Sequence, residues 1–153
     1  MRKLRIYTDT SVIGGFFDDE FSIDTKLLFD EIKNGVYQVV ISDLTERELI
    51  NAPDKVKTLL KDLDIDFDLI PVSRESIGLA NEYLKEKVVG QTSINDCIHI
   101  ATATINKVDL LISWNFKHIV NIQRIRGYNS INLRNGYSTL EIRSPKDLID
   151  YED

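Results

Sequence analysis

The apolar positions of this chain fall into two alternating kinds of segment. Short runs dense in β-branched and other apolar residues predict buried strands, at 4–9, 36–41, 67–72 and 109–113. Between them, apolar residues recur every three or four positions and predict helices, at 24–34, from Ser42 to a break near Pro53, and at 54–63, 74–87 and 94–106. The tail predicts short strands at 130–133 and 139–142 and a final turn after Pro145. Strands that alternate with helices are typical of an α/β fold whose mostly parallel sheet is covered on both faces.

Size and composition favour a single globular domain. The 153 residues are 42% hydrophobic and 29% charged, which is ordinary for a globular chain, so we expect one domain at 1–153 with a core at about 4–135 and a short C-terminal extension. Cys97 is the single cysteine, which excludes an internal disulfide and fits a reducing cytoplasm. No run approaches the roughly 20 apolar residues of a membrane span. We therefore expect a cytoplasmic protein that does not bind membranes.

The charge pattern leaves nucleic-acid binding open. A net charge of −6 argues against a nucleic-acid partner. Residues 97–144, however, carry 6 Lys and Arg against 2 Asp and Glu. Such a locally basic segment is able to meet phosphates, although a solvated basic face explains it equally well.

Three acids and one amide occupy positions where an α/β protein places its chemistry. Asp9 and Asn115 follow the first and fourth predicted strands, Glu48 lies on the helix after the second, and Asp96 lies in the first turn of the helix before the fourth. Ligands of open α/β sheets bind beyond the carboxyl ends of the strands, so the four side chains converge there if the first and fourth strands are neighbours. The alternative for Asp9 is a structural role as the cap of the next helix or turn.

Clustered carboxylates raise their own proton affinities or recruit a cation. Mg²⁺ and Mn²⁺ prefer oxygen ligands, and Mg²⁺ usually keeps several waters that a substrate phosphate can displace. Such an ion polarises a phosphoryl group and lowers the pKa of an attacking water, which suits phosphodiester hydrolysis. The alternative is that the acids are separate surface groups.

Four segments in order resemble the PIN-domain nucleases, in particular small toxin ribonucleases of the VapC type. They are residues 6–13 (IYTDTSVI), 41–49 (ISDLTEREL), 95–103 (NDCIHIATA) and 111–116 (LISWNF). The resemblance implies a Rossmann-like three-layer α/β/α fold and a metal-dependent endoribonuclease using Mg²⁺ or Mn²⁺. It also implies an RNA substrate, a small antitoxin partner of a type II toxin–antitoxin pair, and a homodimer.

In the resemblance, Asp9, Glu48 and Asp96 fall on the acidic metal-site positions of the family. Asn115 stands where the family often has a fourth acid, and we expect it to be an auxiliary metal ligand. An amide oxygen can ligate a hard cation or orient its water, but it supplies no negative charge and would hold a second ion more weakly. The alternative to an active enzyme is therefore an inactive PIN-like scaffold that binds RNA or a protein partner.

Other residues near these motifs have both a functional and a structural interpretation. Ser11 matches a small hydroxyl residue near the first acid and is a candidate to hold a carboxylate or a water. His99 is a candidate to touch substrate, although a packed or capping histidine is the favoured interpretation. Lys117 is a candidate phosphate ligand or a solvated loop residue. Trp114 is expected to pack in the core, and Glu46 to face solvent away from Glu48.

Overall fold

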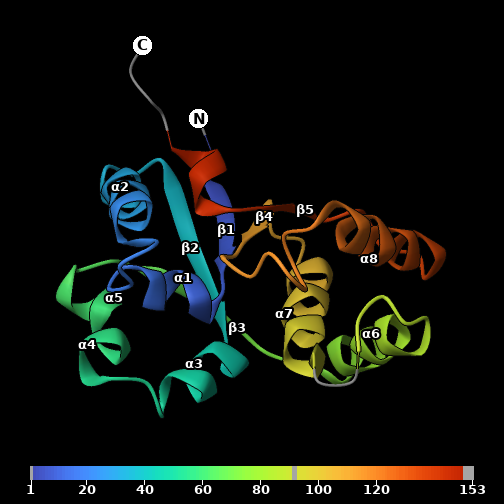
Figure 1. Ribbon diagram of the computed structural model, residues 1–153. Helices are drawn as coiled ribbons and strands as arrows, with labels where there is room; N and C mark the ends of the chain where they lie inside the picture. Colours follow the sequence, from blue (N-terminus) through green and yellow to red (C-terminus); the bar gives the residue numbers. More distant parts are fainter. Residues whose placement is uncertain (1, 91–92, 150–153) are drawn as a thin grey trace.

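The computed structural model describes residues 2–90 and 93–149, which are built around one five-stranded sheet (Figure 1). The strands are β1 (Leu4–Thr8), β2 (Tyr37–Ser42), β3 (Phe67–Ile70), β4 (Leu110–Ile112) and β5 (Glu141–Arg143). Their order across the sheet is β3-β2-β1-β4-β5, and every neighbouring pair is parallel. The predicted α/β fold with a mostly parallel sheet is thus confirmed.

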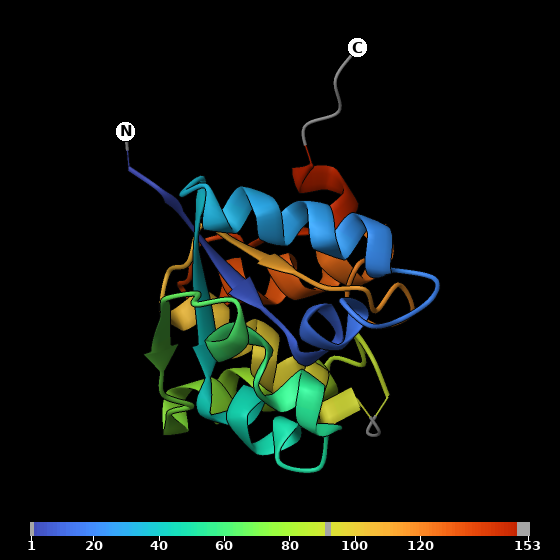
Figure 2. The same ribbon diagram turned by 90° about the vertical axis from the view of Figure 1, so that its left-hand side faces the viewer.

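Helices cover both faces of the sheet. One layer contains α1 (Thr10–Gly15), α2 (Ser22–Lys33), α4 (Asp54–Lys57) and α5 (Leu59–Asp62), and Figure 2 looks onto this layer with the strands behind it. The opposite layer contains α6 (Arg74–Lys85), α7 (Ile94–Ile105) and α8 (Ile122–Arg134). The short α3 (Asp43–Leu49) follows β2 directly, and the 3₁₀ turn η2 (Pro145–Leu148) packs against α2.

Two hydrophobic cores follow from the alternation of side chains along the strands. Ile6 of β1 packs into the α2 layer, whereas the next residue, Tyr7, packs into the α6–α8 layer. Leu110 and Leu111 of β4 divide in the same way. Because both faces are covered, β4 and the middle of β2 are continuous apolar runs, whereas the edge strand β5 alternates polar and apolar residues.

The chain changes direction across the sheet between β1 and β4. From β1 it proceeds through β2 to β3 at one edge, then returns to place β4 on the other side of β1. Asp9 N donates to Ile112 O (3.4 Å), so the carboxyl ends of the two strands are held together. This is the point at which open α/β sheets bind ligands. No helix in the described part of the chain is both long and apolar enough to cross a bilayer.

The predicted strand at 130–133 is wrong, because these residues lie inside α8. Asn121 begins this helix by accepting hydrogen bonds from Gln123 N (3.1 Å) and Arg124 N (3.3 Å). Its buried residues Tyr128 and Ile131 are spaced by one helical turn and pack into the α6–α8 core. The strand predicted at 139–142 is confirmed as β5.

Two further differences concern short helices. The sequence predicted no helix after Asp9, but α1 begins there and places Gly15 in the interior. The helix predicted at 54–63 is divided at Thr58 into α4 and α5. The Thr58 hydroxyl bonds back to Asp54 O (3.1 Å) and donates to Asp62 Oδ2 (2.7 Å), a local hydrogen-bonding alternative that bends helices.

Gly15 is the position in α1 that cannot accept a side chain. A Cβ there would lie 2.8 Å from Cδ1 and Nε1 of Trp114, whereas a Cβ at Gly14 would meet no atom within 4 Å. We expect Gly15→Ala to lower the free energy of unfolding by about 1–3 kcal/mol through overpacking. The matched control Gly14→Ala should be neutral or stabilising by up to about 1 kcal/mol, since alanine favours a helix. Urea unfolding measures both, and equal stability of the two variants would contradict this account.

Candidate active site

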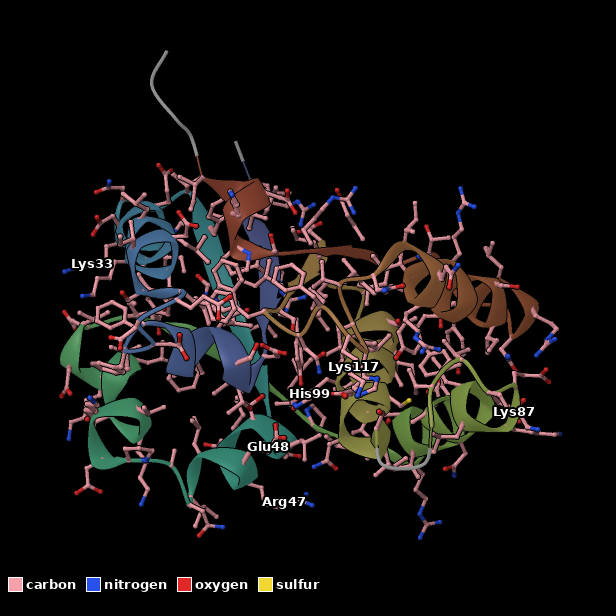
Figure 3. The ribbon with its side chains drawn as sticks, viewed as in Figure 1. Lys33, Arg47, Glu48, Lys87, His99 and Lys117 are labelled. Atoms are coloured by element: carbon pink, nitrogen blue, oxygen red, sulfur yellow. The ribbon has the colours of Figure 1, made fainter. Side chains whose placement is uncertain are left out.

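The four residues singled out by the sequence come from four separate elements around the ends of β1 and β4. Asp9 follows β1 as the N-cap of α1, and Asn115 lies in the turn after β4. Glu48 lies near the end of α3, and Asp96 lies in the first turn of α7. Figure 3 shows Glu48 on α3 beside His99 of α7.

Asp9 is buried, with 5% of its surface exposed, and its carboxylate is fully engaged by hydrogen bonds. Ser11 Oγ donates to Oδ1 (2.6 Å), Ser113 Oγ donates to Oδ2 (2.6 Å), and Val12 N donates to Oδ1 (3.2 Å). The structural and functional interpretations of Asp9 therefore coexist, since it caps α1 and also ends β1. Burial raises the pKa of its carboxyl above the ordinary value, although His99 and the two serine hydroxyls act in the opposite direction.

Asp96 and Asn115 meet across the same edge of the sheet. Asn115 Nδ2 donates to Asp96 Oδ2 in a long hydrogen bond (3.4 Å). The amide oxygen of Asn115 is used elsewhere, because it accepts from Lys117 N (3.1 Å) and His118 N (2.9 Å). Burial raises the pKa of Asp96, and the negative charges of Asp9 and Glu48 raise it further. Asp96 thus lies close enough to the other two acids for their charges to act on it.

Glu48 is the acid whose charge is compensated. Its Oε1 lies 2.6 Å from His99 Nε2 and accepts a hydrogen bond from Thr10 Oγ1 (2.7 Å). Burial would raise the pKa of Glu48, but hydrogen bonding and charge interaction with His99 outweigh it, and the net shift is downward. His99 in turn is 3% exposed, and its Nδ1 lies 2.6 Å from the Tyr7 hydroxyl.

Comparison with protein families connects this geometry with a known fold. The PIN domain family profile matches residues 6–117, which includes all four site residues. The chain belongs to the PIN domain family. A comparison with curated proteins finds no significant match.

Solved structures similar to this PIN domain share its fold at low sequence identity. FitAcB from Neisseria gonorrhoeae gives a TM-score of 0.57 at 15% identity, over 92% of this chain and 97% of that chain. VapBC2 from Rickettsia felis, bound to a DNA fragment from its promoter, gives 0.54 at 17% identity, over 92% and 98%. A toxin–antitoxin complex from Klebsiella pneumoniae gives 0.53 at 20% identity, over 73% and 88%.

The site offers oxygen ligands for a metal ion, but among the described residues they do not form a complete coordination shell. Within residues 2–90 and 93–149, no group of three or more His, Cys, Asp and Glu side chains is arranged to hold a metal ion. The chemistry of the donors nevertheless fits a hard cation. Asp9 is buried and Asp96 is partly buried, and loss of solvation raises the pKa of both carboxyl groups. Carboxylate oxygens are the ligands that hard divalent cations prefer. A divalent cation would compensate the negative charge of these carboxylates.

Sequence reasoning missed two hydroxyl groups that bond the acids and a third that bonds His99. Ser113 holds Asp9, Thr10 holds Glu48, and Tyr7 holds His99. Thr10 follows Asp9 and Ser113 lies two residues before Asn115, but each bonds an acid that is distant in the sequence, so local position did not reveal these roles. Tyr7 gave no signal, because an aromatic residue inside a buried strand is indistinguishable from ordinary core.

Several secondary predictions can also be compared with the structure. Ser11 holds the Asp9 carboxylate, as one of its expected roles required. Trp114 packs in the core, as expected: it is 7% exposed, stacks on Phe21 and donates from Nε1 to Thr25 Oγ1 (3.0 Å). Cys97 is buried, and burial raises the pKa of its thiol to about 12, so it is no nucleophile.

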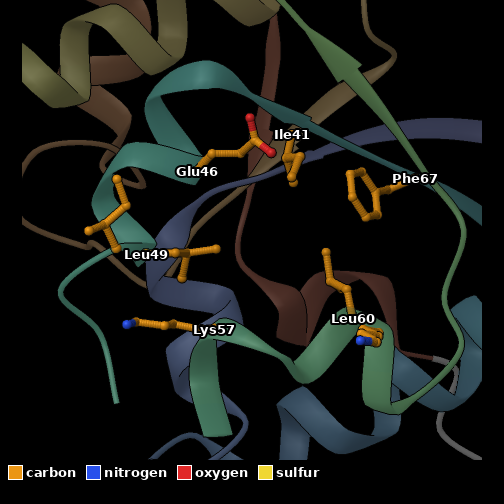
Figure 4. A pocket seen from close by; sticks show the side chains of 8 residues that line it. Ile41, Glu46, Leu49, Lys57, Leu60 and Phe67 are labelled. Carbon is orange, nitrogen blue, oxygen red and sulfur yellow. The ribbon is translucent and has the colours of Figure 1, made fainter. Parts of the chain in front are cut away.

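Glu46 is exposed and does not join the acids, as predicted. It lines a separate apolar groove between α3, α5 and β3, together with Ile41, Leu49, Leu60 and Phe67 (Figure 4). The groove is bordered by Lys57 and Lys61. Glu46 therefore offers a matched control for Glu48, from which it is separated by one residue.

Proposed function

We propose that this PIN domain is a metal-dependent endoribonuclease that hydrolyses RNA phosphodiester bonds. The observation that supports the proposal is Asp9 at the end of β1, beside the end of β4, with the charges of Asp9 and Glu48 both acting to raise the pKa of Asp96. Membership in a family of nucleases supports the same reaction class.

Asp9, Glu48 and Asp96 would hold Mg²⁺ or Mn²⁺. When bound, such an ion supplies a Lewis acid for the phosphoryl oxygens and lowers the pKa of the attacking water. Ser11 and Ser113 hold the two oxygens of Asp9 in fixed directions. We assign Asn115 to orienting Asp96, because its amide nitrogen faces that carboxylate while its oxygen bonds to the backbone of the next turn. Lys117 is exposed beside this turn and is the candidate for a phosphate contact.

The proposal extends from the reaction to a biological role in a toxin–antitoxin pair. Two of the similar structures are described as toxin–antitoxin or VapBC complexes. We infer that this chain acts on RNA in the cytoplasm as a homodimeric VapC-type toxin with a small antitoxin partner. Expression of the chain alone should then arrest growth and degrade cellular RNA. Unchanged growth and intact RNA would remove the toxin role without touching the nuclease chemistry.

The second candidate function is a PIN fold that binds RNA or a protein without cleaving it. The observations that favour it are the amide at Asn115 and the lack, among the described residues, of a group arranged to hold a metal ion. The two candidates differ in their response to divalent cations. Only the nuclease should be stabilised by Mn²⁺ and inactivated by its removal.

The deciding experiment is cleavage of labelled single-stranded RNA in Mn²⁺, with EDTA as the control. We expect cleavage that EDTA abolishes. Glu48→Gln removes a proposed ligand and should reduce the rate by at least about 100-fold, since even the outer groups that support ligands cost about 10- to 100-fold. Glu46→Gln, on the same helix but exposed, should retain the wild-type rate. No cleavage by the wild-type protein, together with no rise in melting temperature in Mn²⁺, would select the non-cleaving scaffold.

A further inference from the structure

A buried line of hydrogen bonds connects β2, β1, α7 and α3. Ser42 Oγ lies 2.7 Å from the Tyr7 hydroxyl, Tyr7 lies 2.6 Å from His99 Nδ1, and His99 Nε2 lies 2.6 Å from Glu48 Oε1. Ser42 and Tyr7 are fully buried, and His99 nearly so, whereas the Glu48 side chain is 28% exposed. The line thus runs from the interior to an acid at the edge of the site.

The chemistry of the groups assigns the direction of the bond to Glu48. A carboxylate only accepts hydrogen bonds, so His99 carries a hydrogen on Nε2 and donates it to Glu48. On the other side of the ring, Nδ1 shares a hydrogen bond with the Tyr7 hydroxyl, which shares another with Ser42 Oγ. The Tyr7 ring also meets the imidazole edge-on, with centroids 5.6 Å apart. The orientation of the His99 ring is therefore fixed by Tyr7 of β1, whose hydroxyl is itself held by Ser42 of β2.

We propose that His99 is a positioning residue that holds the Glu48 carboxylate in the orientation needed for metal binding. This inference rests on the proposed function. A glutamate has several rotatable bonds, and ordering such a side chain costs free energy. Here the donors from His99 and Thr10 both bind Oε1, so they fix that oxygen before an ion arrives. Groups that hydrogen-bond a metal ligand orient it and are needed for full affinity.

A merely packed histidine would not require this arrangement. His99 of α7 lies 51 residues from Glu48 and 92 residues from Tyr7 in the sequence. Both of its imidazole nitrogens nevertheless have a partner at 2.6 Å. An apolar residue of similar size would fill the same volume. What it would not supply is a donor to Glu48, and the experiment separates these two roles.

The measurement is Mn²⁺ affinity by isothermal titration calorimetry on the full chain, with melting temperature in EDTA as the test of folding. We expect His99→Leu to weaken Mn²⁺ binding by about 10- to 100-fold. His99→Gln, which retains a side-chain donor, should recover most of this loss. Tyr7→Phe should weaken binding by a smaller factor, because it leaves His99 in place but without its partner at Nδ1.

Tyr83→Phe is the matched control for Tyr7→Phe. Tyr83 is also a fully buried tyrosine of the α6–α8 core, and its hydroxyl donates to Asn132 Oδ1 away from the site. It should lose stability without losing Mn²⁺ affinity. If His99→Leu does not fold, the comparison of the two tyrosine variants decides.

Each outcome has a definite meaning. Wild-type affinity in His99→Leu, or equal affinities in Tyr7→Phe and Tyr83→Phe, would overturn the positioning role and leave the proposed nuclease intact. A wild-type protein that binds no Mn²⁺ would overturn the proposed function, and the positioning role with it. Weakened binding in His99→Leu with recovery in His99→Gln would establish the role.

Discussion

Asp9→Asn is expected to reduce metal-dependent RNA cleavage by about 10³-fold, a loss comparable with removal of a principal electrostatic group from an active site. The substitution removes one negative charge and changes the shape of the side chain little. Asp9 is buried at the end of β1 and both its oxygens are held by Ser11 and Ser113, so the substitution removes the charge from a fixed position. Single-turnover cleavage of labelled RNA at saturating Mn²⁺ measures the loss of the chemical step.

The choice of asparagine protects the fold in this experiment. Asp9 is the N-cap of α1 and accepts a hydrogen bond from Val12 N, and asparagine is an equally good cap. Melting temperature in EDTA should therefore be maintained or raised, since a buried carboxylate is removed. Asp19→Asn, at an exposed acid in the loop after α1, should leave both cleavage and stability unchanged. Cleavage by Asp9→Asn at more than a tenth of the wild-type rate would exclude Asp9 from the chemistry.

The sheet and its switch point were predictable because they follow from patterns that local sequence contains. Dense apolar runs gave β1 to β4, and strand-ending polar residues gave the edge at which they meet. The α8 helix was not predictable in the same way. Its buried face includes Asn132, which the sequence presents as a polar residue, whereas the apolar Leu133 is exposed. Tertiary hydrogen bonds from Tyr83 and to Thr104 make burial of Asn132 possible, and no local pattern contains them.

The candidate site was also predictable from the sequence only in part. Asp9 and Asn115 were predicted because polar residues that follow strands are conspicuous, and Glu48 and Asp96 because they lie on helices adjoining those strands in segments that resemble the PIN-domain motifs. His99 was assigned a packed role, which its burial confirms, but its bond to Glu48 depends on the distance between α3 and α7. The orientation of Asn115 was likewise hidden, because its oxygen is engaged by a turn that only the folded backbone forms. Residue identities were therefore readable from the sequence, and the partners of those residues were not.

Asp96→Asn is expected to raise the free energy of unfolding at neutral pH although it removes a proposed metal ligand, and the size of this gain is expected to depend on pH. The folded-state pKa of Asp96 is raised by burial and by the charges of Asp9 and Glu48, so the native protein binds this proton more tightly than the unfolded chain does. Stability in EDTA should consequently fall, relative to the asparagine variant, as pH rises from the unfolded value of 3.8 through the folded pKa. At pH 7 the variant should be the more stable protein, by about 0.5–2 kcal/mol, the usual gain from relieving a strained functional group.

Urea unfolding of both proteins between about pH 4 and pH 8 tests this sign, because the other acids are present in both chains and largely cancel. Near the lower limit Asp96 becomes neutral, and the two stabilities should converge. Mn²⁺ should reverse the order at pH 7, since a bound cation stabilises the protein that binds it and the variant has lost a ligand. A stability difference that is independent of pH would show that Asp96 carries no electrostatic cost. If the wild-type protein is the more stable of the two in Mn²⁺, the electrostatic destabilisation by Asp96 in EDTA arises because the acids of a cation site lie near one another without the cation.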